Sequence, residues 1–139
     1  MKTIPYSTQD INEADIKAVT KVLRSGWLTQ GPVVESFEKA IAKKVGAKFG
    51  VAFNSGTAAL HAAYFAAGTG KGDEVIVPTL TFAATANAVL YLGATPVFAD
   101  TDMQTGNMSV DAASAKITPK TKAIVAVDYA GRPVDLNAF

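Results

Sequence analysis

The sequence predicts an α/β protein in which an N-terminal helical segment precedes a mostly parallel β-sheet with helices on both faces. From residue 48 onward, short apolar runs alternate with helix-like segments. These apolar runs have no polar residue at alternate positions, so both faces of each strand are expected to be covered, as in parallel sheets with right-handed crossovers. Before residue 48, by contrast, the apolar residues recur with helical spacing.

Two amphipathic helices are predicted in the N-terminal segment. The first spans residues 12–25, with Asn12 as its N-cap and Gly26 as the residue that ends it. The second begins at Pro32, because proline lacks an N–H group that a first helical turn does not use, and it ends at Gly46. In both segments lysines occupy the faces that the apolar residues leave free.

Four strands and three helices are predicted in the rest of the chain. The predicted strands are residues 49–53, 74–77, 96–99 and 123–127, and the predicted helices are residues 58–67, 81–92 and 110–117. We expect a domain boundary between an N-terminal helical segment, residues 1–46, and a sheet-containing region, residues 47–139. Asp135 is suited to cap a further helix that stops at Phe139, so we interpret the chain as a partial one.

Composition excludes several classes of protein. Apolar residues make up 49% and charged residues 18% of the 139 residues, as in globular proteins. The net charge of +1 argues against a nucleic-acid partner, which needs a concentrated basic surface. With no cysteine, and with His61 as the one histidine, the sequence offers no thiolate or multi-histidine metal site. No apolar run is long enough for a membrane span and no signal-peptide core occurs, so we expect no membrane partner and a cytoplasmic location.

One predicted strand end combines hydroxyl residues with a glycine. Ligands of parallel α/β sheets bind beyond the carboxyl ends of the strands. The strand at residues 49–53 leads through Ser55 to Gly56 and Thr57 at the start of a helix. N–H groups and the helix dipole favour an anion there, and glycine lets it approach the backbone. The alternative is that a hydroxyl simply caps the helix.

Aromatic residues mark three other candidate positions. Phe82 follows the second predicted strand, where its ring could lie against a planar ligand or could serve packing alone. Asp128 and Tyr129 follow the fourth strand and could bond a polar ligand or form a solvated turn. Trp27 lies in a loop that could dock a substrate or a neighbouring subunit, or could pack within its own domain. We interpret His61 as a structural histidine.

Short motifs along nearly the whole chain resemble, in order, those of the DegT-type sugar-nucleotide aminotransferases, which are pyridoxal-phosphate enzymes of fold type I. The runs Gly-Trp-Leu-Thr-Gln-Gly-Pro and Asn-Ser-Gly-Thr-Ala-Ala-Leu are together quite specific. The resemblance implies that residues 47–139 are an incomplete pyridoxal-phosphate-binding large domain. The matching segments are residues 4–7, 25–32, 53–60, 72–78, 81–87 and 127–131.

The resemblance implies roles for residues at the positions that match the family. Gly56 and Thr57 would bind the cofactor phosphate, and Phe82 would stack on the pyridine ring. The family's catalytic aldimine lysine is expected beyond Phe139, so no lysine of this chain takes that role. The positions that match substrate contacts are Tyr6, Gly26, Trp27, Leu28, Thr29 and Gly56.

The implied activity is a transamination. Pyridoxal phosphate would act as electron sink while an amino group passes from an amino acid, L-glutamate by resemblance, to C4 of a UDP-linked 4-keto-6-deoxy sugar. A homodimer with shared active sites is implied for the intact enzyme, and we expect the 139-residue chain alone to be inactive. Two alternatives remain open: a related pyridoxal-phosphate-dependent sugar dehydratase, in which histidine replaces the lysine, and a non-catalytic sugar-nucleotide-binding module.

Overall fold

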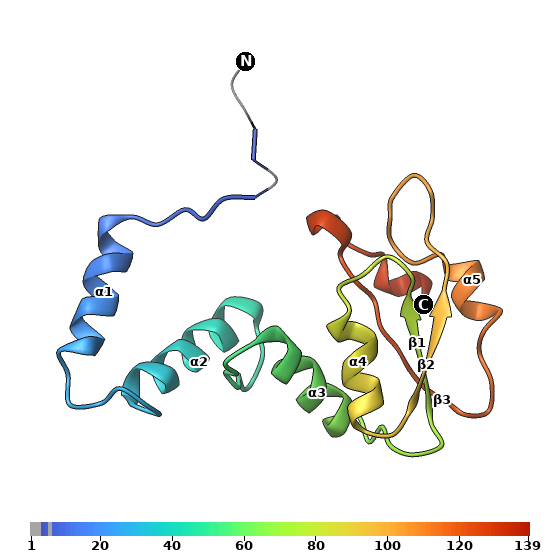
Figure 1. Ribbon diagram of the computed structural model, residues 1–139, viewed down its shortest axis with the longest axis horizontal. Coiled ribbons are helices and arrows are strands. Elements are labelled where there is room, and N and C mark those ends of the chain that lie inside the picture. Colours follow the sequence, from blue (N-terminus) through green and yellow to red (C-terminus); the bar gives the residue numbers. More distant parts are fainter. Residues whose placement is uncertain (1–3, 6) are drawn as a thin grey trace. The chain divides into compact units, whose positions relative to one another are not determined.

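The computed structural model describes residues 4–5 and 7–139 of the chain (Figure 1). The chain divides into two compact units, Met1–Ala52 and Phe53–Phe139, and the candidate site residues are distributed over both.

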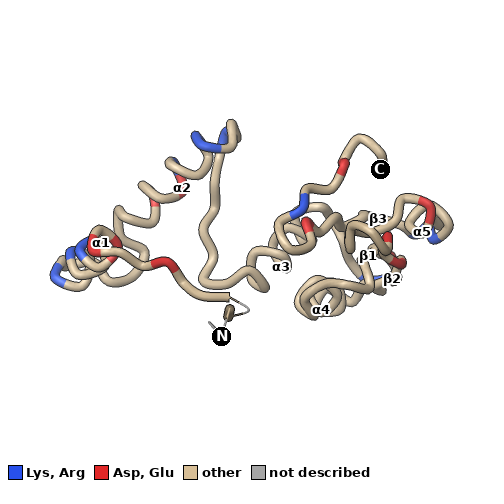
Figure 2. Tube along the Cα trace, turned by 90° about the horizontal axis from the view of Figure 1, so that it is seen from above, with Lys and Arg blue, Asp and Glu red and all other residues tan. Residues whose placement is uncertain are grey.

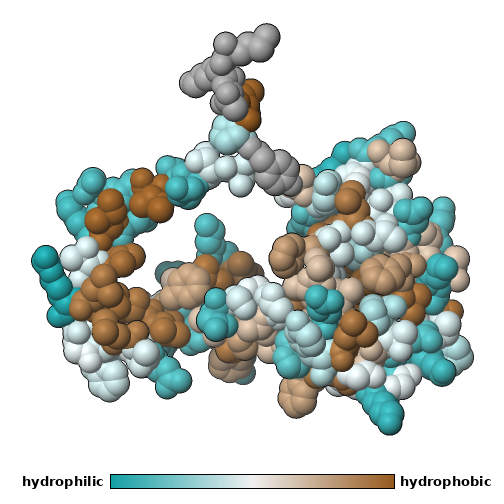
Figure 3. Space-filling model, in the orientation of Figure 1, coloured by the Kyte–Doolittle hydropathy of each residue, from teal (hydrophilic) through white to brown (hydrophobic). Residues whose placement is uncertain are grey.

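The first unit contains the two helices predicted for it, α1 (Glu13–Leu23) and α2 (Pro32–Val45). Asn12 caps α1, and Gly46 ends α2 in the left-handed conformation, with φ of 71°, that glycine adopts without strain. No residue of α1 is buried, α2 buries only Ala42, and most of the large apolar side chains of both helices remain exposed on this unit (Figure 3).

The second unit is built on a parallel sheet of three strands, β1 (Glu74–Pro78), β2 (Thr95–Ala99) and β3 (Thr121–Ile124), in the order β2-β1-β3. The central strand β1 supplies the fully buried core residues Val75, Ile76 and Val77. Because side chains alternate between the faces of a strand, Val75 and Val77 belong to one hydrophobic cluster and Ile76 belongs to a second cluster on the other face. The parallel sheet and its order confirm the predicted class of fold.

Helices cover both faces of this sheet (Figure 1). Val75 and Val77 pack with Tyr64 and Val89 on the face covered by α3 (Gly56–Ala66) and α4 (Ala84–Tyr91). Ile76 packs on the other face with a cluster that includes a residue of α5 (Val110–Ser114). Two short 3₁₀ helices, η1 (Tyr129–Gly131) and η2 (Leu136–Ala138), follow β3.

The prediction of a strand at residues 49–53 is wrong. This segment forms no strand and is not part of the sheet, whose order is β2-β1-β3. Its backbone is held instead by α2: Ala52 N donates to Glu38 Oε1 at 2.8 Å. Gly50 also lies so close to α2 that a Cβ there would approach Glu38 O to 2.7 Å. An apolar run without a neighbouring strand edge therefore remains irregular.

Candidate functional site

Helix α3 begins at an exposed N-terminus that can accept an anion. The Ser55 hydroxyl caps the helix by accepting a hydrogen bond from Ala58 N at 3.2 Å, so capping falls on Ser55 and not on Thr57. The first-turn N–H groups of Gly56 and Thr57 have no acceptor within the helix. A Cβ placed on the exposed Gly56 would meet no atom within 4 Å, so the space before this helix end is open. These features fit a phosphate group.

No Lys or Arg side chain of α3 or α4 adds to the positive end of the α3 helix dipole. Neither α3 nor α4 contains a Lys, Arg, Asp or Glu, and both are uniformly tan in Figure 2. An anion here would therefore be held by N–H groups, a hydroxyl and the helix dipole.

Phe82 lies in the turn between β1 and α4. Its side chain is 78% exposed, so it contributes little to the core of its own unit. The turn itself is ordered by hydrogen bonds: Thr85 N donates to Phe82 O at 3.0 Å, and the hydroxyls of Thr81 and Thr85 lie 2.8 Å apart. An exposed ring on a fixed turn at the carboxyl end of a central strand can stack on a planar ligand.

A buried tyrosine joins the two helices that carry these residues. Tyr64 of α3 is 5% exposed, and its hydroxyl donates to Thr85 O, in the first turn of α4, at 3.0 Å. Burial raises the pKa of the Tyr64 hydroxyl, because the apolar surroundings disfavour its charged form. A specific contact thus joins the last turn of α3 to the first turn of α4. Tyr64 was not predicted as part of a site, because its spacing in the sequence is that of an ordinary core residue.

The third strand end forms a turn with its own internal bonds. Asp128 Oδ1 accepts a hydrogen bond from Val134 N at 2.9 Å, so this carboxylate has a structural partner. Tyr129 is 38% exposed and begins η1. Asp128 therefore shapes a turn, which was one of its two predicted roles.

The loop between α1 and α2 belongs to the first unit. The Ser25 hydroxyl donates to Val22 O at 2.7 Å and lies 3.2 Å from Trp27 N, which donates to it. Gly31 makes a close approach, since a Cβ there would lie 2.8 Å from Trp27 Cβ. Trp27 and Leu28 are both 65% exposed. An open pocket of about 410 Å³ beside this loop is lined by Ala18, Lys21, Val22, Ser25, Trp27, Pro32 and Val33.

The substrate-binding residues of the resemblance are thus only partly described. Gly26, Leu28 and Thr29 lie with Trp27 in this exposed loop. Tyr6 lies outside the described residues. Gly56 belongs to the second unit.

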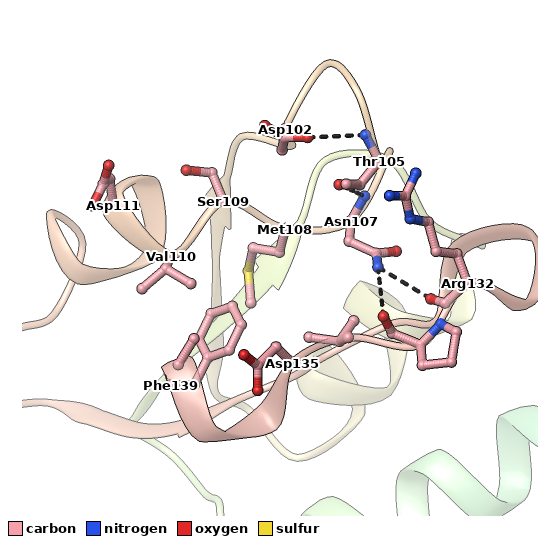
Figure 4. Close-up of a pocket in the computed structure, with 13 residues that line it drawn as sticks. Asp102, Thr105, Asn107, Met108, Ser109, Val110, Asp111, Arg132, Asp135 and Phe139 are labelled. Carbon is pink, nitrogen blue, oxygen red and sulfur yellow. Dashed lines mark hydrogen bonds between the residues drawn. The ribbon is translucent and has the colours of Figure 1, made fainter.

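A second pocket of about 400 Å³ lies on the other unit and was not predicted (Figure 4). Its lining includes Asp102, whose pKa is lowered by hydrogen bonds from Thr105. It also includes Asn107, a buried polar residue in a stretch that looks like an ordinary loop in the sequence. No sequence motif marks this pocket, because its walls come from segments separated by more than twenty residues.

The 4–5 and 7–139 stretches hold no group of three His, Cys, Asp or Glu side chains placed to bind a metal. Every helix within those same stretches is too short or too polar to cross a lipid bilayer.

The chain belongs to the DegT/DnrJ/EryC1/StrS aminotransferase family, which it matches over residues 9–139. It is 50% identical over 136 residues to the spore coat polysaccharide biosynthesis protein SpsC of Bacillus subtilis (strain 168). That match covers 98% of this chain and 35% of SpsC.

Solved structures show the same similarity. Spr1654 from Streptococcus pneumoniae, solved in a PLP-form and a PMP-form, is 39% identical with a TM-score of 0.92, over 99% of this chain and 35% of that one. Helicobacter pylori PseC, an aminotransferase involved in the biosynthesis of pseudoaminic acid, is 40% identical with a TM-score of 0.89, over 99% of this chain and 37% of PseC. The chain therefore spans about a third of the length of these relatives.

Proposed function

We propose that this chain is part of a pyridoxal-phosphate-dependent sugar aminotransferase. The observations that carry the proposal are the open N-terminus of α3 and the exposed Phe82 turn before α4, and a hydrogen bond of the Tyr64 hydroxyl connects these two helices. Membership of an aminotransferase family and similarity to a protein solved in PLP-form and PMP-form support the choice of cofactor.

The residues of the second unit have complementary roles in this proposal. The N–H groups of Gly56 and Thr57, with the Thr57 hydroxyl, hold the cofactor phosphate. Phe82 stacks on the pyridine ring and sets its plane. When bound, the cofactor supplies an electron sink for transfer of the amino group. The protein fixes the position and orientation of the ring and phosphate, which is where it lowers the barrier.

The substrates are an amino-acid donor, L-glutamate, and a UDP-linked 4-keto-6-deoxy sugar that is aminated at C4. The exposed loop at residues 26–29, with Tyr6 and Gly56, contacts the sugar nucleotide. A finer hypothesis is the UDP-4-amino-4,6-dideoxy-N-acetyl-β-L-altrosamine transaminase of pseudaminic acid biosynthesis, supported by the similarity to PseC. The B. subtilis relative, a polysaccharide biosynthesis protein, supports a sugar substrate more generally.

The proposal includes an arrangement for the whole protein. Residues 1–46 form an N-terminal helical segment and residues 47–139 contribute to the cofactor-binding domain. The whole protein is a cytoplasmic homodimer. The exposed apolar residues of α1 and α2 support self-association, because such surface is stabilised when another protein surface removes it from water.

The phosphate site is tested by a binding measurement on the cofactor-free whole protein that carries this chain. The probe is 4′-deoxypyridoxine 5′-phosphate, which has no aldehyde and cannot bond covalently to lysine. Thr57→Val removes one hydroxyl without changing side-chain volume. A hydrogen bond to a charged group contributes about 1.5–3 kcal/mol, so we expect binding to weaken about tenfold or more.

Thr95→Val is the matched control, since Thr95 is exposed at the amino end of β2, away from the proposed site. Equal affinities of the two variants would contradict the phosphate site. Amination of a UDP-linked 4-keto-6-deoxy sugar with glutamate tests the reaction itself. Water loss from the sugar without amination would identify a dehydratase instead, and binding without either reaction would identify a non-catalytic module.

A further inference from the structure

One buried side chain joins two loops at the carboxyl end of the sheet. Asn107 is 8% exposed and lies in the loop between β2 and α5. Its Nδ2 donates to Arg132 O at 3.1 Å and to Pro133 O at 3.4 Å (Figure 4). Its Oδ1 accepts from Tyr129 N at 3.0 Å. Both the nitrogen and the oxygen of the carboxamide therefore form hydrogen bonds with the backbone of the turn that follows β3.

The loop that holds Asn107 is itself constrained. Asp102 Oδ1 accepts hydrogen bonds from Gln104 N at 3.0 Å and from Thr105 N at 2.9 Å. Asp102 N in turn donates to Asn107 O at 2.8 Å. Asn107 N donates to Thr105 Oγ1 at 3.1 Å. The Asn107 carboxamide is thus held in place by the turn at residues 102–107. Because it bonds the turn that follows β3, the position of that turn depends on the turn at residues 102–107.

Two further contacts connect the same loops. Gly106 has φ of +73°, and a Cβ there would lie 2.7 Å from Cδ1 of the Tyr129 ring. Glycine is therefore required both by the backbone conformation and by the close approach of this ring. Arg132 Nη1 also donates to Gln104 O at 3.2 Å.

The turn that these contacts hold has a strained residue. Ala130 has φ of 53° and ψ of 27°, the left-handed region that residues with a Cβ rarely adopt. Such conformations persist only where the surroundings determine them, and they occur often at ligand sites. Asn107 bonds Tyr129 on one side of Ala130 along the chain and Arg132 and Pro133 on the other. These three hydrogen bonds hold Ala130 in its strained conformation.

The turn is placed beside the proposed cofactor site by the strand order. Strand β3 is the parallel neighbour of β1, and Val125 N continues their pairing by donating to Ile76 O at 2.9 Å. Because the two strands are parallel, both end at the same edge of the sheet (Figure 1). Along the chain, Phe82 follows β1 and Asp128 follows β3. Ligands of parallel sheets bind at this edge.

We propose that Asn107 is a positioning residue that fixes the turn at residues 128–131, and that this turn forms one side of the cofactor pocket beside Phe82. The identity of the ligand rests on the proposed function, whereas the fixing of the turn rests on contacts within the second unit alone. The two parts are therefore tested separately.

The first test is hydrogen exchange, followed by mass spectrometry, on the whole protein. Asn107→Ala removes all three hydrogen bonds. Asn107→Asp keeps the volume and the acceptor for Tyr129 N, but it places an oxygen against two carbonyls. In both variants we expect exchange in the 128–133 peptide to accelerate at least tenfold, with exchange in the β1 peptide unchanged. Asn137→Ala is the control, because Asn137 is exposed in η2.

Unchanged exchange at 128–133 would overturn the positioning role. Faster exchange of β1 in both Asn107 variants would also overturn it, since Asn107 would then support the entire core. The second test measures affinity for 4′-deoxypyridoxine 5′-phosphate, which should fall several-fold in both variants and not in Asn137→Ala. If exchange at residues 128–133 accelerates but the affinity for the probe is unchanged, the turn does not form a side of the cofactor pocket. A parent protein that binds no probe refutes the proposed function and that place together, while the exchange result still decides the fixing of the turn.

Discussion

Tyr64 shows how a single core residue can set the geometry of a site it does not enter. Its ring fills the core under α3 and α4, and its hydroxyl reaches Thr85 O at the start of α4. Burial of a hydroxyl is unfavourable unless it forms a hydrogen bond, so this contact specifies one spacing of the two helices.

We predict that Tyr64→Phe lowers the free energy of unfolding by about 1 kcal/mol, the net contribution of a typical buried hydrogen bond. Urea denaturation followed by far-ultraviolet circular dichroism measures the change. Tyr91→Phe makes the same chemical change at a side chain that is 58% exposed, and we expect it to leave stability unaltered. Equal losses in the two variants would show that the hydroxyl of Tyr64 contributes nothing specific.

The raised pKa of Tyr64 gives a pH dependence with a defined sign. The unfolded chain releases this proton at its ordinary pKa, whereas the folded chain retains it to higher pH. The stabilising contribution is therefore complete below the unfolded pKa and is lost as the pH rises through the folded pKa. Tyr64→Phe should remove this alkaline loss of stability.

At the residue scale, the sequence predicted exposed candidate residues better than it predicted the buried residues that hold their surroundings in place. Phe82 is exposed and follows the strand β1, as predicted, whereas Gly56 is exposed at the start of α3 but does not follow a strand. Tyr64 and Asn107 were missed because each acts on a partner more than twenty residues away. Nothing in a local pattern distinguishes an asparagine in a solvated loop from one that is buried and fully bonded.

At the scale of elements, the N-terminus of α1 is determined by its cap. Asn12 Oδ1 accepts from Ala14 N at 2.8 Å, and Asp15 Oδ2 accepts from Asn12 N at 2.9 Å, which completes a capping box. Because α1 buries no residue, this local arrangement contributes a large share of the helix's stability.

We therefore predict that Asn12→Ala destabilises α1 by about 1 kcal/mol, the usual cost of losing an N-cap. Amide exchange in the first turns of α1 should accelerate about fivefold, while exchange in β1 stays the same. Asn12→Asp retains an acceptor at the cap and should behave like the parent. If alanine and aspartate give the same exchange rates, the cap is not what holds this helix end.

Elements with local signals were predicted most accurately. The start of α2 at Pro32 and its end before Gly46 follow from proline and glycine chemistry, and both agree with the structure. The predicted strand at residues 49–53 failed because a strand needs a partner as well as an apolar sequence. The predicted fourth strand, residues 123–127, corresponds to β3, which begins at Thr121 and ends at Ile124, and Val125 N still donates to Ile76 O.

At the scale of the whole molecule, the two units differ in how much apolar surface they remove from water. The sheet unit has two buried clusters, one on each face. Among the residues of the helical unit that the structure describes, only Ala42 is buried, whereas Phe37 of α2 is 56% exposed. Exposed apolar helix faces of this kind are typical of association surfaces. This contrast supports the proposed homodimer and leads to a prediction for the chain itself.

We predict that the 139-residue chain self-associates and that Phe37→Ser weakens the association. Burying a phenylalanine side chain contributes about 1.5–3 kcal/mol, so the dissociation constant should rise at least tenfold. Sedimentation velocity over a range of concentrations measures this change. Lys43→Ser alters a charged residue of the same helix and should leave association intact. A parent chain that sediments as a monomer at every concentration would remove the support that these helix faces give to a dimer, because their apolar residues would then be tolerated in water.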